Sequence, residues 1–235
     1  GELFLYECLV PSSMAGDAYA LAGVTEALTE AVAAEGIADY VEFRMDGATH
    51  PLDALDDYDG SLPLIVSNRP EWAGGTAGES DRLETLAAAA AFDAVEMVDV
   101  ELRTIRECEW LRDELRERDV ERIVSYYDRQ STPQESELSK IMSKCSDYGD
   151  VAKLVVSAEE KSDSLALLQS FNAASEEGVR VTGYALGDIG RHTRVIGVFY
   201  GASIAYAPIV SDERSPNDID LETLSNLLEW VSSAR

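Results

Sequence analysis

The sequence predicts a single (β/α)₈ barrel, the TIM barrel of the α/β class, over residues 1–235. Short runs rich in β-branched and aromatic residues alternate along the chain with longer segments that carry a helical pattern. Repeated strand–helix units need crossover connections, and crossovers give a parallel sheet. Hydrophobic residues make up 46% of the chain, and no Pro-rich or Ser-rich linker divides it. One domain with a sizeable core is therefore expected.

Eight runs fit the strand pattern, which is the number that closes a barrel of this class. In chain order they are residues 3–10, 40–46, 63–68, 94–102, 122–127, 151–157, 180–186 and 203–210. The clearest helical segments between them are residues 81–92, 103–119, 135–149 and 162–178. An open doubly wound sheet is the alternative fold, but no G-x-G-x-x-G motif follows the first run to support a dinucleotide site.

The chain is strongly acidic, with 45 acidic and 19 basic residues and a formal net charge of −26. Such a charge repels phosphate backbones and anionic lipid, so no nucleic-acid or membrane partner is expected. The lysines are few: Lys140, Lys144, Lys153 and Lys161. An acidic, lysine-poor surface around an ordinary core is typical of halophilic, haloarchaeal proteins. An acidic mesophilic protein is the alternative.

The cysteines indicate a reducing compartment. Cys8, Cys108 and Cys145 form no C-x-x-C pair and cannot all be joined by disulfides. No apolar run approaches the roughly 20 residues that a membrane-spanning helix needs. The first ten residues contain Glu2 and Glu7 and no basic leader, so they are not expected to form a signal peptide. A cytoplasmic location is therefore expected.

Polar residues at the strand ends should meet at the mouth of the barrel, because the active sites of this fold lie at the carboxyl ends of the strands. The residues placed in this way are Glu42, Arg44, Asp46, Asn68, Arg69, Asp99, Glu101, Tyr127, Asp128, Lys153 and Arg194. Asp99 and Glu101 could form a metal pair, although the alternation of side chains along a strand explains them without one. The two histidines, His50 and His192, have no metal-site spacing, and no metal site is expected.

Lys153 is the candidate chemical centre. It lies among apolar β-formers in "DVAKLVVSA", residues 150–158, where burial of a charged head is costly. Loss of water favours the neutral amine, and nearby Arg44, Arg69 or Arg194 would act in the same direction. A neutral amine can attack a carbonyl carbon, and the resulting imine helps a proton to leave the adjacent carbon. The alternative is a lysine whose head reaches water.

Six motifs occur in an order that resembles one enzyme family. They are "EFRMD" (42–46), "SNRPEWAGG" (67–75), "VDVEL" (98–102), "SYYDRQSTP" (125–133), "DVAKLVVSA" (150–158) and "GDIGRHTR" (187–194). Together they resemble type I 3-dehydroquinate dehydratase over nearly the whole chain. The resemblance implies a (β/α)₈ lyase, commonly a homodimer, that converts 3-dehydroquinate to 3-dehydroshikimate in the shikimate pathway of aromatic amino-acid biosynthesis. The family uses no dissociable cofactor.

The resemblance also implies roles for individual residues. Lys153 matches the lysine that forms a Schiff base with the substrate ketone. Glu42 and Arg44 match an E-x-R pair that contacts substrate, while Arg69 and Arg194 match arginines that hold its hydroxyls and carboxylate. A guanidinium suits a carboxylate because it can donate two parallel hydrogen bonds.

The chain departs from the family pattern at several of its functional positions. Tyr127 stands where the family has a histidine that shuttles protons, and Arg129 replaces the aromatic residue that follows. Ala73 stands where a glutamate orients that histidine. Asp218 stands where the closing loop supplies a substrate-binding glutamine. We therefore expect Tyr127 in the acid–base position and Asp218 in the substrate-binding position.

Tyr127 leaves the strength of the activity open. A phenol with a pKa near 10 is ionised in about one molecule in a thousand at neutral pH, whereas a histidine near 6.5 exchanges protons readily. Loss of an acid–base group costs about 10²- to 10⁴-fold in rate, so weakened activity is expected. Two alternatives remain. One is a diverged paralogue that binds a related cyclic carboxylic acid, and the other is a Schiff-base aldolase with phosphate at Gly183, Gly187 and Gly190.

Overall fold

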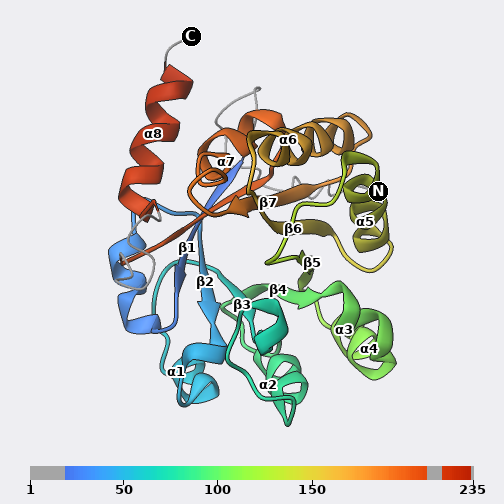
Figure 1. Cartoon of the computed structure of the whole chain (residues 1–235). Coiled ribbons are helices and arrows are strands. Elements are labelled where there is room, and N and C mark those ends of the chain that lie inside the picture. The colour runs from blue at the N-terminus through green and yellow to red at the C-terminus, as the bar shows by residue number, and fades with distance from the viewer. Residues whose placement is uncertain (1–18, 211–218, 234–235) are drawn as a thin grey trace, which may run out of the picture.

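The computed structural model describes residues 19–210 and 219–233, and these residues form one sheet of eight parallel strands. The strands lie in the order β7-β6-β5-β4-β3-β2-β1-β8, so they follow one another around the sheet in chain order (Figure 1). Their bounds are β1 (Ala20–Thr25), β2 (Tyr40–Arg44), β3 (Leu64–Ser67), β4 (Val95–Glu101), β5 (Glu121–Tyr127), β6 (Val151–Ser157), β7 (Val181–Leu186) and β8 (Ile204–Pro208).

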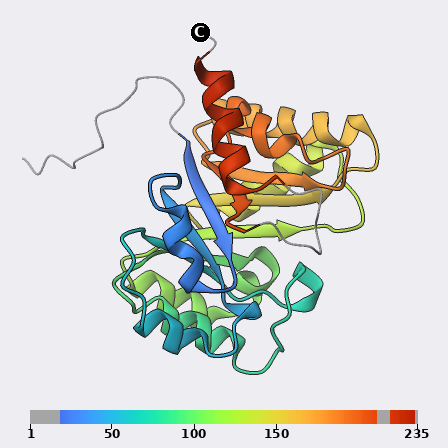
Figure 2. The ribbon, with the colours of Figure 1, turned by 90° about the vertical axis from the view of Figure 1, so that its left-hand side faces the viewer.

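Helices connect the strands and cover the outside of the sheet, as Figure 2 shows from the side. The α-helices are α1 (Pro51–Asp56), α2 (Arg82–Ala89), α3 (Leu102–Glu107), α4 (Glu109–Glu117), α5 (Glu135–Ser146), α6 (Lys161–Glu176), α7 (Thr193–Ile196) and α8 (Leu221–Ser233). The 3₁₀ helices are η1 (Leu28–Ala34), η2 (Met45–Gly47), η3 (Glu71–Ala73) and η4 (Gly197–Tyr200). The helix predicted over residues 103–119 is divided into α3 and α4 at Cys108, whose backbone is extended. Among the described residues, each helix is too short or too polar to span a membrane.

The strands at the two ends of the sheet approach each other and nearly close the barrel. The backbone N–H of Ser203 donates to the carbonyl of Val181 over 2.7 Å, and Thr182 Oγ1 donates to the carbonyl of Ile204 over 2.5 Å. Both bonds join the first residues of β7 to the start of β8. The predicted (β/α)₈ barrel is confirmed, and the open doubly wound alternative is wrong.

The first strand of the barrel differs from the prediction. The predicted run at residues 3–10 lies outside the described residues, and Ala20–Thr25 takes the first place, paired with β2 and β8. This strand is poor in β-branched residues and contains Gly23, which weakens a strand signal in the sequence. A Cβ at Gly23 would lie 2.8 Å from Ile209 Cγ1 and 3.0 Å from Leu221 Cδ2. The glycine therefore allows the segment after β8 and the start of α8 to pack against β1.

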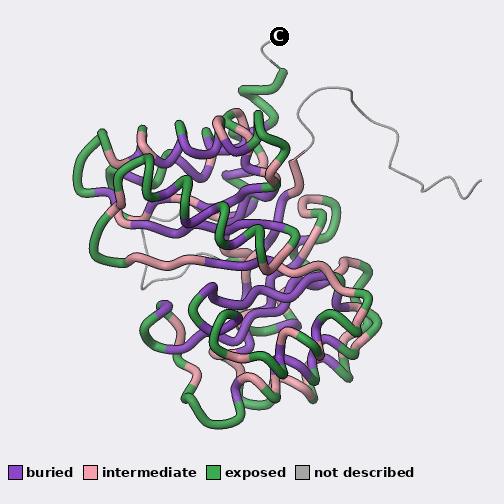
Figure 3. The backbone as a smooth tube through the Cα atoms, turned by 90° about the vertical axis from the view of Figure 1, so that its right-hand side faces the viewer, coloured by how far each residue is buried: buried purple, intermediate pink, exposed green. Residues whose placement is uncertain are grey.

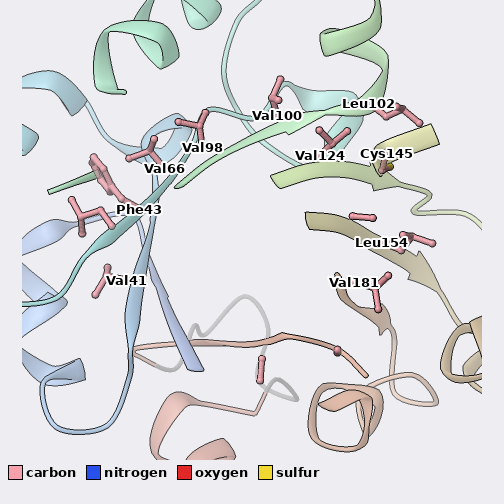
Figure 4. Packing of buried hydrophobic residues seen from close by; sticks show 14 of the residues in the cluster. Val41, Phe43, Val66, Val98, Val100, Leu102, Val124, Cys145, Leu154 and Val181 are labelled. Carbon is pink, nitrogen blue, oxygen red and sulfur yellow. The ribbon is translucent and has the colours of Figure 1, made fainter. Parts of the chain in front are cut away.

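Side chains alternate between the two faces of the sheet and form two apolar layers. The outer layer packs the sheet against the helices and includes Val41, Phe43, Val66, Val98, Val124 and Leu154, which are shown in Figure 4. The inner layer consists of Ala22, Ile65, Met97, Ile123, Val151, Ile204 and Tyr206. Because both faces are covered, most strand residues are buried, as Figure 3 shows in purple.

Candidate active site

Four charged side chains meet inside the barrel, beyond the inner apolar layer. Lys153 comes from β6, two residues after Val151 and on the same face of the strand. Glu42 comes from β2, Asp99 from β4, and Arg69 from the loop that follows β3. None of the four is more than 4% exposed. Burial of charge at this depth is unfavourable unless each group is paired and hydrogen-bonded.

The four groups pair with one another. Lys153 Nζ donates to Glu42 Oε2 over 3.0 Å and to Asp99 Oδ2 over 2.9 Å. Arg69 Nη2 donates to Asp99 Oδ2 over 2.9 Å and also to Glu42 Oε1. Ser67 Oγ donates to the same Glu42 oxygen over 3.2 Å. Two cations and two anions thus form a closed network, which offsets the cost of burying them.

The network keeps both carboxylates ionised. Burial alone would raise the pKa of Asp99, but the charges of Lys153 and Arg69 outweigh it and lower the pKa to about 2. Burial likewise opposes ionisation of Glu42, and Arg69 and Lys153 lower its pKa below the usual value. Both groups are therefore anions at neutral pH, and neither is a strong proton acceptor.

This environment of Lys153 differs from the one suggested by the sequence. The groups that contact its amine are carboxylates, which stabilise the ammonium, rather than the arginines that would repel it. Arg69 lies close because it shares both carboxylates with Lys153. The sequence placed Asp99 at the barrel mouth but did not identify it as a partner of Lys153. Its signal was its inward position late in β4.

Arg44 is held by Asp46 at the mouth. Its Nε donates to Asp46 Oδ1 over 2.9 Å and its Nη2 to Asp46 Oδ2 over 2.7 Å. The same carboxylate accepts the backbone N–H groups of Arg69 over 3.3 Å and Thr76 over 3.2 Å. Arg44 and Asp46 therefore join the end of β2 to the loop after β3, and they fix the backbone from which Arg69 enters the barrel.

Arg194 reaches the mouth from α7, where it is 8% exposed. Its Nη1 donates to the carbonyl of Tyr206 over 3.1 Å, and its guanidinium carbon lies 3.6 Å from the ring centroid of Tyr184 on β7. Tyr206 in turn places its ring 3.9 Å from Lys153 Nζ. The hydroxyl of Thr193 accepts the N–H of Ala185 over 2.8 Å, which ties α7 to β7 and sets the position of Arg194.

Tyr127 ends β5, with the guanidinium carbon of Arg69 4.7 Å from its ring centroid. Its hydroxyl oxygen is buried and has no hydrogen-bond partner within the described part of the chain. Burial raises the pKa of Tyr127 well above its usual value; Arg69 opposes the shift and Asp99 adds to it. At neutral pH Tyr127 is therefore a protonated phenol, which can donate a proton or hydrogen bond but cannot act as a base.

Asp218 lies outside the described residues, so its predicted role stays a prediction. Several other residues named in the sequence analysis are described and take no part in this network. Ala73, in η3, is buried, and His50 and His192 are exposed. Glu101 accepts hydrogen bonds from Arg82 Nη1 over 3.2 Å and Thr104 Oγ1 over 2.7 Å, so it belongs to a second ion pair rather than to a metal pair with Asp99. Across residues 19–210 and 219–233, no group of three or more His, Cys, Asp or Glu side chains is placed to hold a metal ion.

Comparison with known proteins places these residues in a family context. The family model described as type I 3-dehydroquinase matches residues 20–235. The 3-dehydroquinate dehydratase of Haloquadratum walsbyi is 40% identical over 232 residues, which cover 93% of this chain and 95% of that protein. The corresponding protein of Halobacterium salinarum is 37% identical and covers 83% of this chain and 89% of its own length.

Solved structures support the same fold. The type I 3-dehydroquinate dehydratase of Clostridium difficile superposes with a TM-score of 0.83 at 18% identity, over 94% of this chain and 95% of that one. The 3-dehydroquinate dehydratase of Geobacillus kaustophilus gives a TM-score of 0.80 at 22% identity, over 93% of each chain. At identities this low, the structural similarity shows a shared barrel fold and nothing further.

Proposed function

Because the chain belongs to the type I 3-dehydroquinase family, we propose that it dehydrates 3-dehydroquinate to 3-dehydroshikimate through a Schiff base on Lys153. The observation that carries this proposal is the position of Lys153. It is the inward-facing lysine of β6, 1% exposed, and it is held by anions beside the arginines of the barrel mouth. A lysine with only a surface role would keep its ammonium group in water.

Lys153 acts first as a nucleophile. The amine adds to the ketone carbon, and the ketone oxygen takes up two of the three ammonium protons and leaves as water, so that a cationic imine remains. Glu42 and Asp99 orient the amine toward the centre of the barrel through bonds of 3.0 and 2.9 Å. They also stabilise the cationic imine that replaces the ammonium, so the charge balance of the network is kept when the imine forms.

The arginines hold the anionic substrate. Arg194 and Arg69 bring guanidinium groups to the mouth, and each can donate parallel hydrogen bonds to a carboxylate or to hydroxyls. Arg44 and Glu42 complete the substrate contacts that the family resemblance implies, and Asp218 is proposed to contribute from the closing loop. In a protein with a net charge of −26, this local positive charge is needed to attract a carboxylate.

Tyr127 is proposed to act only as a proton or hydrogen-bond donor. Its raised pKa keeps the phenol protonated, so it can assist the departing hydroxyl but cannot remove a proton from carbon. The activity is therefore expected to be weaker than that of an enzyme with a histidine at this position.

The proposal includes a cytoplasmic homodimer. Cys108 and Cys145 are free thiols, as is usual in a reducing compartment. Leu227, Trp230 and Val231 on α8 are exposed by 38%, 73% and 38% on one face of the helix, and an apolar face of this kind fits a contact between subunits. Light scattering during size-exclusion chromatography should give twice the chain mass. A monomer mass at micromolar concentration would exclude the dimer.

Turnover of 3-dehydroquinate tests the function. The wild-type chain should form the conjugated product, which is followed by its ultraviolet absorbance, and Lys153→Met should not. Lys161→Met is the matched control, because Lys161 is an exposed lysine at the start of α6. Substrate binding without turnover in the wild type would favour the diverged paralogue. Turnover of ketose phosphates instead would favour the aldolase.

A further inference from the structure

Tyr184 is an inward-facing tyrosine of β7 that lies one strand from Lys153. In the register of β6 and β7, Lys153 pairs with Thr182 and Val155 pairs with Tyr184. Because alternate residues of a strand share one face, Tyr184 lies on the same side as Thr182 and one step nearer the mouth. It packs against the inner apolar layer and remains partly exposed. Tyr184 is thus placed next to the space that a ketone bound to Lys153 would fill.

Cationic side chains from three parts of the chain, Arg194, Lys153 and Arg69, act on Tyr184. Arg194 from α7 stacks on its ring at 3.6 Å. Burial is the largest single influence and would raise the pKa of Tyr184, but the combined charges of Arg194, Lys153 and Arg69 lower it below the usual value. Glu42 from β2 acts in the opposite direction and does not cancel them.

The other tyrosines of this end of the barrel behave differently. Tyr127 on β5 and Tyr206 on β8 both interact electrostatically with Tyr184, and each has a hydroxyl that is buried with no hydrogen-bond partner among the described residues. Burial raises the pKa of both well above the usual value. The carboxylates of Glu42 and Asp99 have the opposite property. Their pKa values are lowered, so they bind a proton weakly.

The dehydration needs a group that takes a proton from carbon and then gives one to oxygen. Tyr127 and Tyr206 stay protonated and cannot take a proton from carbon, and Glu42 and Asp99 bind a proton too weakly. We propose that Tyr184 is the proton-exchanging catalytic residue of this site, an inference that rests on the proposed dehydratase function.

The step balances without another reactant. The phenolate of Tyr184 takes a proton from the carbon next to the Lys153 imine, and the electrons of that C–H bond become the double bond of an enamine. The enamine electrons then expel the hydroxyl from the next carbon. That hydroxyl takes the proton from the Tyr184 phenol and leaves as water, so Tyr184 returns to phenolate. Arg194 stabilises the phenolate at the beginning and end of the cycle.

The substitution Tyr184→Phe removes one hydroxyl and keeps the ring that Arg194 contacts. We expect kcat to fall by about 10²- to 10⁴-fold, which is the range for a lost acid–base group. The rise of kcat with pH that reports formation of the phenolate should disappear. Borohydride should still attach substrate to Lys153, because imine formation does not need the phenolate. Tyr126→Phe is the control, since Tyr126 packs in the outer layer.

The outcomes separate this inference from the function on which it rests. If the wild type traps substrate on Lys153 but Tyr184→Phe keeps its kcat within threefold and an unchanged pH profile, Tyr184 is not the proton-exchanging residue. If the wild type traps no substrate, the dehydratase function fails and the inference fails with it.

Absorbance titration of phenolate gives a measurement independent of turnover. In the wild type, one tyrosine should ionise below the usual pKa of about 10, and this step should be missing from Tyr184→Phe. A wild-type chain in which no tyrosine ionises early would overturn the inference, whatever the activity of the variant.

Discussion

Asp99→Asn tests the buried ion network that positions Lys153. The pKa of Asp99 is lowered from 3.8 to about 2, which is equivalent to about 2 kcal/mol of folding stability at neutral pH. Because the folded-state pKa is the lower one, this stability is present above the unfolded value and is lost as pH falls through the folded value. Roughly half of it, about 1 kcal/mol, should be lost between about pH 6 and pH 3.

Urea unfolding of wild type and Asp99→Asn at about pH 6 and about pH 3, in constant salt, measures this pH-dependent contribution to the free energy of unfolding. At about pH 6 the variant should be less stable by about 3 to 5 kcal/mol, since one partner of a buried pair has been removed. At about pH 3 the gap between the two proteins should be narrower by about 1 kcal/mol. Using the difference cancels the titration of the other carboxylates.

Asp113→Asn is the matched control. Asp113 is 61% exposed in a surface pair with Arg116 at 3.4 Å, and pairs of this kind contribute little. Its stability should stay close to that of the wild type at both pH values. A gap between wild type and Asp99→Asn that is equal at pH 6 and pH 3 would refute an ionised, ion-paired Asp99.

Three further predictions concern the proton donor, the backbone and the surface charge. Tyr127→His should raise the kcat of the Tyr184→Phe variant at neutral pH by about tenfold or more, because imidazole exchanges protons near pH 6.5; steady-state kinetics showing no rescue would contradict this. Gly183→Ala should destabilise the fold by more than about 2 kcal/mol in urea unfolding, since Gly183 has φ +133° and an added Cβ would lie 1.8 Å from the Leu154 carbonyl oxygen. Gly78→Ala, where nothing lies within 4 Å of the added Cβ, should be neutral; equal losses in the two variants would count against the argument. Raising potassium chloride from about 0.1 M to about 2 M should raise the thermal midpoint by about 5 °C or more, because it screens the net charge of −26; calorimetry showing no increase would contradict this.

The fold was predictable where the pattern was regular. The strands from β2 to β8 carry enough β-branched residues, and enough turn residues beside them, to be placed within a few residues. β1 was not found, because "ALAGVT" consists mostly of small residues with low strand propensity. Their small size allows neighbouring elements to pack closely against the strand. The break between α3 and α4 at Cys108 was also missed, because the residues around it have the composition of one continuous helix.

The site was predictable in its members more than in its contacts. Inward position late in a strand identified Glu42, Arg69 and Lys153 as neighbours. The same rule placed Asp99 at the mouth and would also have placed Tyr184, which was not singled out. How strongly charges separated by 54 or 111 residues would pair could not be read from their positions in the chain. Alternation gives the face of a strand on which a residue lies; the partner across the barrel depends on the closure of the sheet.

Borohydride reduction in the presence of 3-dehydroquinate, followed by mass analysis of the peptides, tests most directly whether the buried amine of β6 bonds covalently to the substrate. The account predicts a mass increase confined to the peptide that contains Lys153, and its absence from the Lys153→Met variant. An unchanged mass in the wild type, or a label on another lysine, would contradict it.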